Sequence, residues 1–115
     1  MAAKTFTPGN KNGTTDGATP VDIVLAPAAS AQRMVRTLVV NNKDSAAVTL
    51  TVKLVEASTG YTIFKGSLDP DQSWVWGSGS EVLVLDDTDK KVTAVLGGSV
   101  AATEPDYTSH YADIS

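Results

Sequence analysis

The sequence of 115 residues contains no cysteine and only one histidine, His110. The absence of cysteine excludes disulfide bonds, thiolate metal sites and cysteine nucleophiles. A lone histidine lacks the oriented partner that general-base catalysis needs, and a metal site would need further ligands. We therefore interpret His110 as a surface or interface residue, and we predict no catalytic residue, no metal and no cofactor.

Long apolar runs and clustered basic residues are also missing. No run approaches the roughly 20 apolar residues that cross a bilayer, and the first residues lack the apolar segment of a secretion signal. The net charge is −4, and the basic residues are scattered, whereas nucleic-acid-binding proteins usually gather them on one face. We expect a soluble, cytoplasmically made chain that binds neither membrane nor nucleic acid.

The clearest pattern that is present lies in residues 33–56. Its second half alternates apolar and polar residues, which places four apolar side chains on one face of a strand. These four residues are Val48, Leu50, Val52 and Leu54. The preceding residues 34–41 form an apolar run with few breaks, as in a strand covered on both faces. Since residues 42–45 suit a tight turn, the pattern predicts a long antiparallel hairpin whose alternating apolar residues belong to the core.

Other short strand-like segments follow at intervals of about 8–12 residues, and no window shows helical periodicity. The predicted strands cover residues 21–25, 34–41, 48–54, 61–68, 73–76, 81–85, 90–96 and 107–114. This spacing predicts an all-β domain over residues 18–115. We expect an antiparallel β-sandwich of about eight strands, with an immunoglobulin-like or a jelly-roll topology.

Residues 1–17 are small and polar, and Phe6 is their one large apolar side chain apart from Met1. Such a segment cannot bury enough apolar surface to hold itself in place. We predict an extended N-terminal arm that is either flexible or docked on a partner through Phe6.

The chain between residues 73 and 85 has more apolar side chains than one sheet face can bury. A two-layer sandwich has one inner face per sheet, so part of this surface would need cover from another subunit. The residues predicted for such an interface are Phe6, Trp74, Trp76, Leu83 and Leu85. Two alternatives stay open: closure of the sheet within one chain, and a carbohydrate platform formed by the rings of Trp74 and Trp76.

The acidic turn of residues 86–89 offers carboxylate oxygens to a cation. It lacks the twelve-residue loop with a fixed glycine and a terminal glutamate that marks an EF-hand calcium site. We interpret it as a solvated turn, and cation binding there stays open.

Four segments resemble small β-sandwich structural proteins of tailed bacteriophages. They read V-x-I-V-L-A-P-A-A-S-A-Q-R-M-V-R-T-L-V-V-N-N, A-A-V-T-L-T-V-K-L, L-D-P-D-Q-S-W-V-W and D-Y-T-S-H-Y-A-D-I-S, within residues 21–115. The resemblance implies a non-enzymatic virion protein that is assembled in the host bacterial cytoplasm. Its family members serve as capsid decoration (cement) proteins, as neck or tail accessories, or as fibre modules.

The resemblance favours a decoration protein that binds the head surface as a homo-oligomer, with a trimer among the candidate states. The implied partners are further copies of the chain and the major capsid protein or the neck and tail proteins. A neck, tail or fibre-attachment role is the first alternative. A glycan-binding adhesion module that uses Trp74 and Trp76 is the second.

Overall fold

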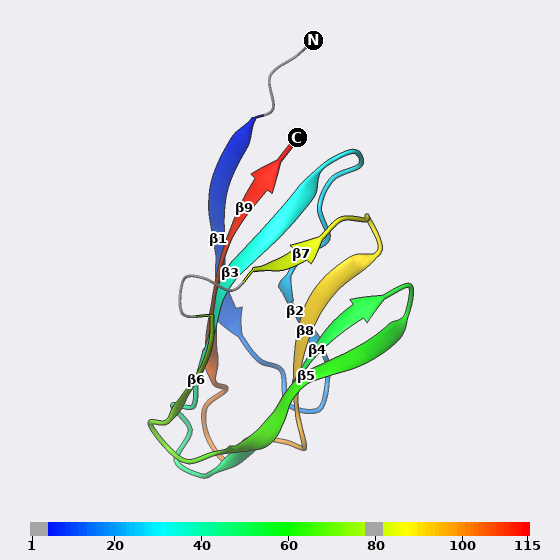
Figure 1. Ribbon diagram of the computed structural model, residues 1–115. Coiled ribbons are helices and arrows are strands. Elements are labelled where there is room, and N and C mark those ends of the chain that lie inside the picture. Colours follow the sequence, from blue (N-terminus) through cyan, green and yellow to red (C-terminus); the bar gives the residue numbers. More distant parts are fainter. Residues whose placement is uncertain (1–4, 78–81) are drawn as a thin grey trace.

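A computed structural model describes residues 5–77 and 82–115 of the chain. These residues form nine strands and no helix, and the strands build two antiparallel sheets that pack face to face (Figure 1). The predicted fold class, an all-β antiparallel sandwich, is confirmed. Within the described ranges there is accordingly no helix of the length and apolarity that crossing a membrane requires.

Sheet I has four strand positions. Their order is β1 (Phe6–Thr14), β9 (Asp106–Ile114), β3 (Gln32–Asn41) and β6 (Ser73–Trp76). The last position is shared, because β7 (Leu83–Leu85) pairs with residues 33–35 of β3 and β6 pairs with residues 38–41 of the same strand. Thus β6 and β7 lie one after the other along one edge of β3.

Sheet II contains the other four strands. Their order is β2 (Val21–Val24), β8 (Lys90–Leu96), β4 (Val48–Glu56) and β5 (Thr59–Leu68). Across both sheets the pairing is nested: β1 pairs with β9, β2 with β8, β3 with β6 and β7, and β4 with β5. First-with-last pairing of this kind describes a ribbon folded over itself, which is a jelly roll rather than an immunoglobulin-like sandwich.

The predicted hairpin over residues 33–56 is wrong, because its two strands lie in different sheets. Residues 42–47 carry the chain from β3 in sheet I to β4 in sheet II. Asn42 is fully buried there, and its side-chain amide donates to the carbonyls of Ala46 at 3.0 Å and Leu68 at 2.9 Å. The polar residues of this segment therefore bond to neighbouring backbone in a crossing instead of closing a tight turn.

Asp44, in the same crossing, is also buried, and it holds a second loop. Its carboxylate accepts hydrogen bonds from the backbone N–H groups of Ala101, Ala102 and Thr103 at 2.8–3.0 Å. These hydrogen bonds, those from Thr103 and Ala101 foremost, lower the pKa of Asp44 to about 2. Hydrogen bonds that favour the charged form are the physical cause of such a shift. The crossing between the sheets is thus tied to the loop that precedes β9.

The core lies between the sheets and contains the residues predicted from alternation. Val48, Leu50 and Val52 are buried, and Leu54 is half-buried against them. From sheet I the core receives Val35, Leu38, Val40, Leu85 and Tyr107. The inner face of each sheet therefore supplies one half of a shared apolar layer.

Residues 6–14 of the segment that we assigned to an arm form β1. The strand pairs with β9 along its whole length, from Phe6 opposite Ile114 to Thr14 opposite Asp106. Gly9 and Gly13 lie beneath the rings of Tyr111 and Tyr107: a Cβ atom on Gly13 would stand 2.7 Å from the Tyr107 hydroxyl oxygen. The tyrosines of β9 thus take the space that side chains of β1 would fill. Docking of this segment on a partner stays a prediction.

Candidate interaction surfaces

The two tryptophans of β6 point toward sheet II. Trp74 lies opposite Val40 and Trp76 opposite Leu38, and residues directly opposite each other in a sheet share a face. Val40 and Leu38 are fully buried, so both rings lie on the inner face. The Trp74 ring also stacks on Phe64 of β5, with ring centroids 5.1 Å apart. Both rings are half-buried between the sheets, which leaves no flat two-ring platform on the outer face of β6.

Leu83 and Leu85 also face inward. They lie opposite Val35 and Arg33 on β3, and Leu85 is completely buried in the core. The exposed apolar residues of this region are instead Val75, Val82 and Val84, at 58%, 44% and 42% of their full exposure. An interface role for Trp74, Trp76 and Leu83 stays a prediction, whereas Leu85 has no exposed area of its own to contribute.

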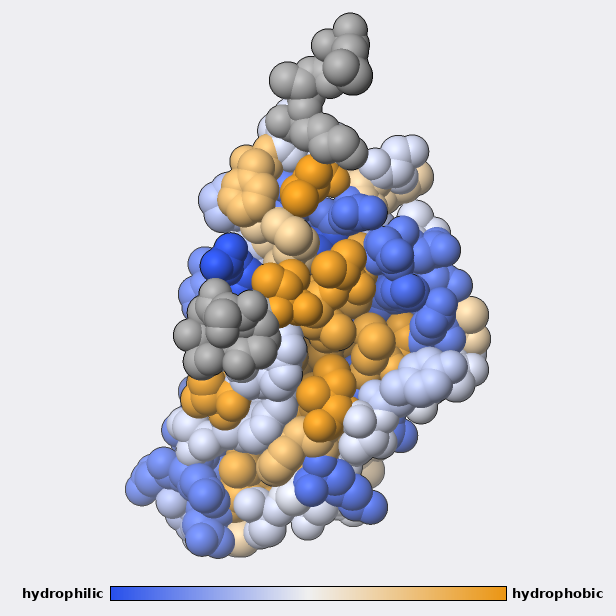
Figure 2. Space-filling view, in the orientation of Figure 1, coloured by the Kyte–Doolittle hydropathy of each residue, from blue (hydrophilic) through white to orange (hydrophobic). Residues whose placement is uncertain are grey.

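The sandwich is open along the side where β6 and β7 lie across from β5. Figure 2 shows hydrophobic side chains gathered in a band between the two sheets on this side. The half-buried apolar residues that pack against the core from these strands are Ile63, Phe64, Trp74, Trp76 and Leu83. This band is the border of the core itself, since the aromatic stack of Phe64 and Trp74 bridges the two sheets there.

The outer face of sheet I is a second apolar surface. Met34 of β3 lies between Ala112 of β9 and Val84 of β7, and Phe6 is paired with Ile114. The apolar residues on this face are Phe6, Pro8, Met34, Val39, Val75, Val84, Ala112 and Ile114, of which Ala112 is buried. Phe6 and Val75 are the most exposed of them, at 56% and 58%.

Uncharged polar residues fill the middle of this face. His110 lies between Asn10 of β1 and Thr37 of β3, and Thr108 lies between Asn12 and Val39. His110 is exposed, as predicted for a surface or interface residue. Two charged residues lie on or beside the face: Arg36 at the bulge of β3, and Asp106 at one end in an ion pair with Lys43 at 2.8 Å.

The outer face of sheet II is polar and charged. Its outward positions on β4, β5 and β8 carry Thr49, Thr51, Lys53, Thr62, Lys65, Ser67, Lys91 and Thr93, with Val55 and Val95 as the valines. Lys91 forms an ion pair with Asp22 of β2 at 3.0 Å. Threonine and lysine on a sheet face suit contact with water, so this face needs no cover.

The long edge strands are protected against addition of another strand. Thr5 and Ser115 exchange both backbone hydrogen bonds, so the N–H groups of every second residue from Phe6 onward point to the open edge of β1. Pro8 is one of these residues and has no N–H to donate. On the other edge strand, β5, a bulge leaves Ile63 outside the ladder, and Lys65 is exposed. Bulges, lysine and proline on edges prevent edge-to-edge association.

Arg33 fixes one end of the sandwich. Its guanidinium forms a two-pronged ion pair with Asp113, at 2.7 Å and 3.0 Å, and donates to the carbonyl of Leu25 at 2.8 Å. It also lies 4.1 Å from the centre of the Tyr111 ring. The hydrogen bonds with Asp113 raise the pKa of Arg33. Each of the three guanidinium nitrogens thus donates a hydrogen bond within the domain, which indicates a structural role.

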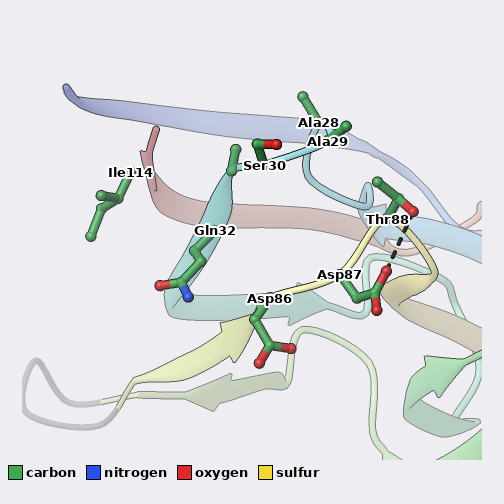
Figure 3. A pocket seen from close by; sticks show the side chains of 9 residues that line it. Ala28, Ala29, Ser30, Gln32, Asp86, Asp87, Thr88 and Ile114 are labelled. Atoms are coloured by element: carbon green, nitrogen blue, oxygen red, sulfur yellow. Dashed lines mark hydrogen bonds between the residues drawn. The ribbon is translucent and has the colours of Figure 1, made fainter. Parts of the chain in front are cut away.

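The acidic turn after β7 borders a shallow cleft of about 380 Å³. Figure 3 shows its walls: residues 28–32 before β3, Ile114 of β9, and residues 86–88 of the turn. Asp86 accepts a hydrogen bond from the Lys90 ammonium at 2.7 Å, which lowers the pKa of Asp86. In the described part of the chain no group of three or more histidine, aspartate and glutamate side chains is placed to hold a metal ion. Since Asp86 is paired with Lys90, its negative charge is already balanced within the domain.

Comparisons with known proteins show the fold. No protein-family model matches the sequence, and no curated protein matches it either. A subunit of the Bacillus endospore appendages, described as a novel family of disulfide-linked pili, aligns over 97% of this chain and 88% of its own, at 12% identity and a TM-score of 0.54. This similarity shows a shared fold.

Two virus structures align less closely. A chain of the virus-like particle of the extra small virus of the giant freshwater prawn Macrobrachium rosenbergii covers 99% of this chain and 80% of its own, at 6% identity and a TM-score of 0.44. A chain of the capsid asymmetric unit of cyanophage Pam1 covers 96% and 84%, at 12% identity and a TM-score of 0.37. The structural neighbours are thus capsid and appendage proteins.

Proposed function

We propose that this chain is a non-enzymatic structural protein of a bacteriophage particle, a capsid decoration protein that binds the head surface as a homo-oligomer. The observation that carries the proposal is the outer face of sheet I, which is polar at its centre and exposes apolar side chains at its rim, namely Phe6, Val75 and Val84. Exposed apolar patches of this kind mark protein–protein contacts. The sequence resemblance to small β-sandwich virion proteins suggests that the assembly is a bacteriophage particle.

The protected edges also support assembly through a face. An open edge strand would let subunits add one after another into a fibre, whereas face contacts between symmetric copies close upon themselves. The appendage subunit with the similar fold belongs to disulfide-linked pili. This chain has no cysteine, so it would assemble through non-covalent surfaces alone.

A neck or tail accessory role is the second candidate, and the same face supports it equally. The two roles differ in copy number, because decoration proteins cover a whole head while a neck or tail ring holds few subunits. The glycan-binding alternative loses support, since Trp74 and Trp76 turn toward sheet II and Trp74 stacks on Phe64.

Quantitative mass spectrometry of purified particles tests the proposal. We expect hundreds of copies of the chain per particle, and a small multiple of three or six would favour the neck or tail instead. Absence of the chain from washed particles would overturn the virion role altogether. As a control, a particle treated to release surface proteins should lose this chain before the major capsid protein.

A further inference from the structure

The strand β3 is covered on only one of its two faces. Its inward residues Val35, Leu38 and Val40 are fully buried, whereas Met34 and Val39 on the other side are half exposed. The apolar run of residues 34–41 predicted a strand covered on both faces, and the described part of the chain covers only one of them. The outer face of sheet I is the side that has no cover among the described residues.

We propose that this face binds the same face of a second copy, so that two sandwiches associate back to back through their sheets I about a two-fold axis. The inference deepens the proposed function, on which it rests, because it names the contact that makes the homo-oligomer. A two-fold contact uses the same patch on both copies, so each residue on the face serves both partners.

The size of the face suits a dimer. The nine residues of β1 and of β9 span roughly 30 Å, and four strand positions span roughly 19 Å at the usual spacing of ~4.8 Å. Each copy therefore offers about 570 Å², and the pair would bury about 1,100 Å², against the ~1,000 Å² that a specific interface needs. The face is large enough only if most of it is used, which favours a flat partner of the same shape.

Charge identifies the second copy as the partner. The outward positions of β1, β9 and β3 that pair across sheet I carry no Asp, Glu, Lys or Arg except Asp106 at one end, and Arg36 lies at the unpaired bulge of β3. Interface centres are depleted of charge. A partner that buries this face must be uncharged at its own centre as well. Sheet II of another copy would bring Lys53 and Lys65 into the contact, and neither forms an ion pair among the described residues. Their charges would therefore be buried without partners. Sheet I of another copy brings Arg36 and Asp106, and Asp106 already forms an ion pair with Lys43 of its own chain.

Two sheets that pack face to face keep their strands within about 30° of each other. A two-fold axis that lies between the two sheets, parallel to them and over the middle of the face, then places His110 and Thr37 of both copies near the axis. Their ring nitrogens and hydroxyl groups can exchange hydrogen bonds with the same groups of the partner. Phe6 and Val75 lie toward opposite corners of the sheet and form the apolar rim.

Sedimentation equilibrium of the isolated chain at tens of micromolar gives the first test. We expect a mass twice that of the 11.9 kDa chain. Val75→Asp and Val84→Asp each place two carboxylates in the contact and should weaken self-association by more than about tenfold. The matched control is Val95→Asp, because Val95 faces outward on sheet II, and it should leave the dimer intact. If a sheet I variant fails to fold in circular dichroism melts, Phe6→Asp at the start of β1 takes its place.

A cross-link gives the second test, since the natural chain has no cysteine. His110→Cys should give a covalent dimer with a short thiol-to-thiol linker, and Thr51→Cys on the outer face of sheet II should not. A monomeric wild type, or equal cross-linking at both positions, would overturn the proposal. Particle binding separates it from the proposed function: a monomer that is found in particles refutes only the back-to-back dimer, whereas a dimer that is absent from particles refutes only the virion role.

Discussion

The two sheets of this sandwich share one core and differ on their outer faces. The outer face of sheet I presents Phe6, Met34, Val75, Val84 and Ile114, while that of sheet II presents lysine and threonine. Both sheets supply fully buried valine and leucine to the inner layer. The difference lies in the outer faces alone, and we propose that the outer face of sheet I is the side that meets another protein.

The inner faces of both sheets form the core, and substitutions there should have the largest effect on stability. Leu38→Ala in sheet I and Leu50→Ala in sheet II should each lower the free energy of unfolding by about 2–5 kcal/mol, because each deletes a fully buried side chain and leaves a cavity. Thr51→Ala, next to Leu50 on the outer face, should cost less than about 1 kcal/mol. Urea melts measure all three. Equal losses at Leu50 and Thr51 would contradict the assigned facing.

Asp44 ties the segment that crosses from sheet I to sheet II to the loop before β9. Its pKa in the folded protein is about 2, below its ordinary value of 3.8. A lowered folded-state pKa means that the contribution of Asp44 is complete above the unfolded value and is lost as the pH falls toward 2. Unfolding free energies measured between these limits should fall with pH, and Asp44→Asn should flatten that dependence while lowering stability at neutral pH. An unchanged acid dependence in Asp44→Asn would exclude this role.

The place of β1 in sheet I can be tested through its glycines. Gly13→Ala puts a methyl group within 2.7 Å of the Tyr107 hydroxyl and should cost about 1–3 kcal/mol through overpacking. Gly98→Ala is the control, since nothing lies within 4 Å of its added Cβ. Thermal melts compare the two, and hydrogen exchange of β1 amides should rise in Gly13→Ala alone. Equal behaviour of the two variants would mean that β1 does not pack beneath the tyrosines.

The smallest effect on stability should come from giving sheet I the surface chemistry of sheet II. Val75→Thr with Val84→Thr replaces two exposed valines by residues of similar shape, and we expect the unfolding free energy to change by less than about 0.5 kcal/mol. Self-association should nevertheless weaken, because apolar area is lost from the contact. Sedimentation and melts on the same sample separate the two effects. A large loss of stability would place these side chains in the core rather than on the surface.

Local patterns in the sequence were sufficient to predict most strands. The alternation around Leu50 predicted both β4 and its buried face, and β6 and β8 have the predicted limits. The partner of a strand is not a local property, however. The polar residues at 42–45 fit a tight turn, and only the tertiary contacts of Asn42 and Asp44 show that they cross between sheets.

The strand β1 was not predicted because its residues carry no strand signal of their own. Pro8, Gly9 and Gly13 argue against a strand when only the local sequence is considered. They fit in the structure because Pro8 lies on an edge and the glycines make room for Tyr111 and Tyr107, about 100 residues further along the chain. The signal that could have revealed β1 is the shared four-residue spacing of the two glycines and the two tyrosines.

The predicted interface residues illustrate a second limit. The surplus of apolar side chains was counted over residues 73–85 as one segment, although two separate strands, β6 and β7, lie within it. In the structure both strands turn their aromatic or leucine side chains inward, so that Val75 and Val84 share the outer face. Alternation predicts the facing of residues within one strand and cannot be continued from one strand into the next. Residues 78–81, which lie between β6 and β7, are outside the described part of the chain.

The nested pairing has a consequence for how the protein is made. Because β1 pairs only with β9 and β2 pairs with β8, the first two strands to leave the ribosome have no partner until the last two have been synthesised. Contacts between such distant parts of the chain form slowly, since loop closure must precede them. Among the described strands, β4 and β5 are the pair that follow each other in sequence and can form a hairpin early. Folding should therefore start from the middle of the chain, and β1 should stay unpaired until β9 has been made.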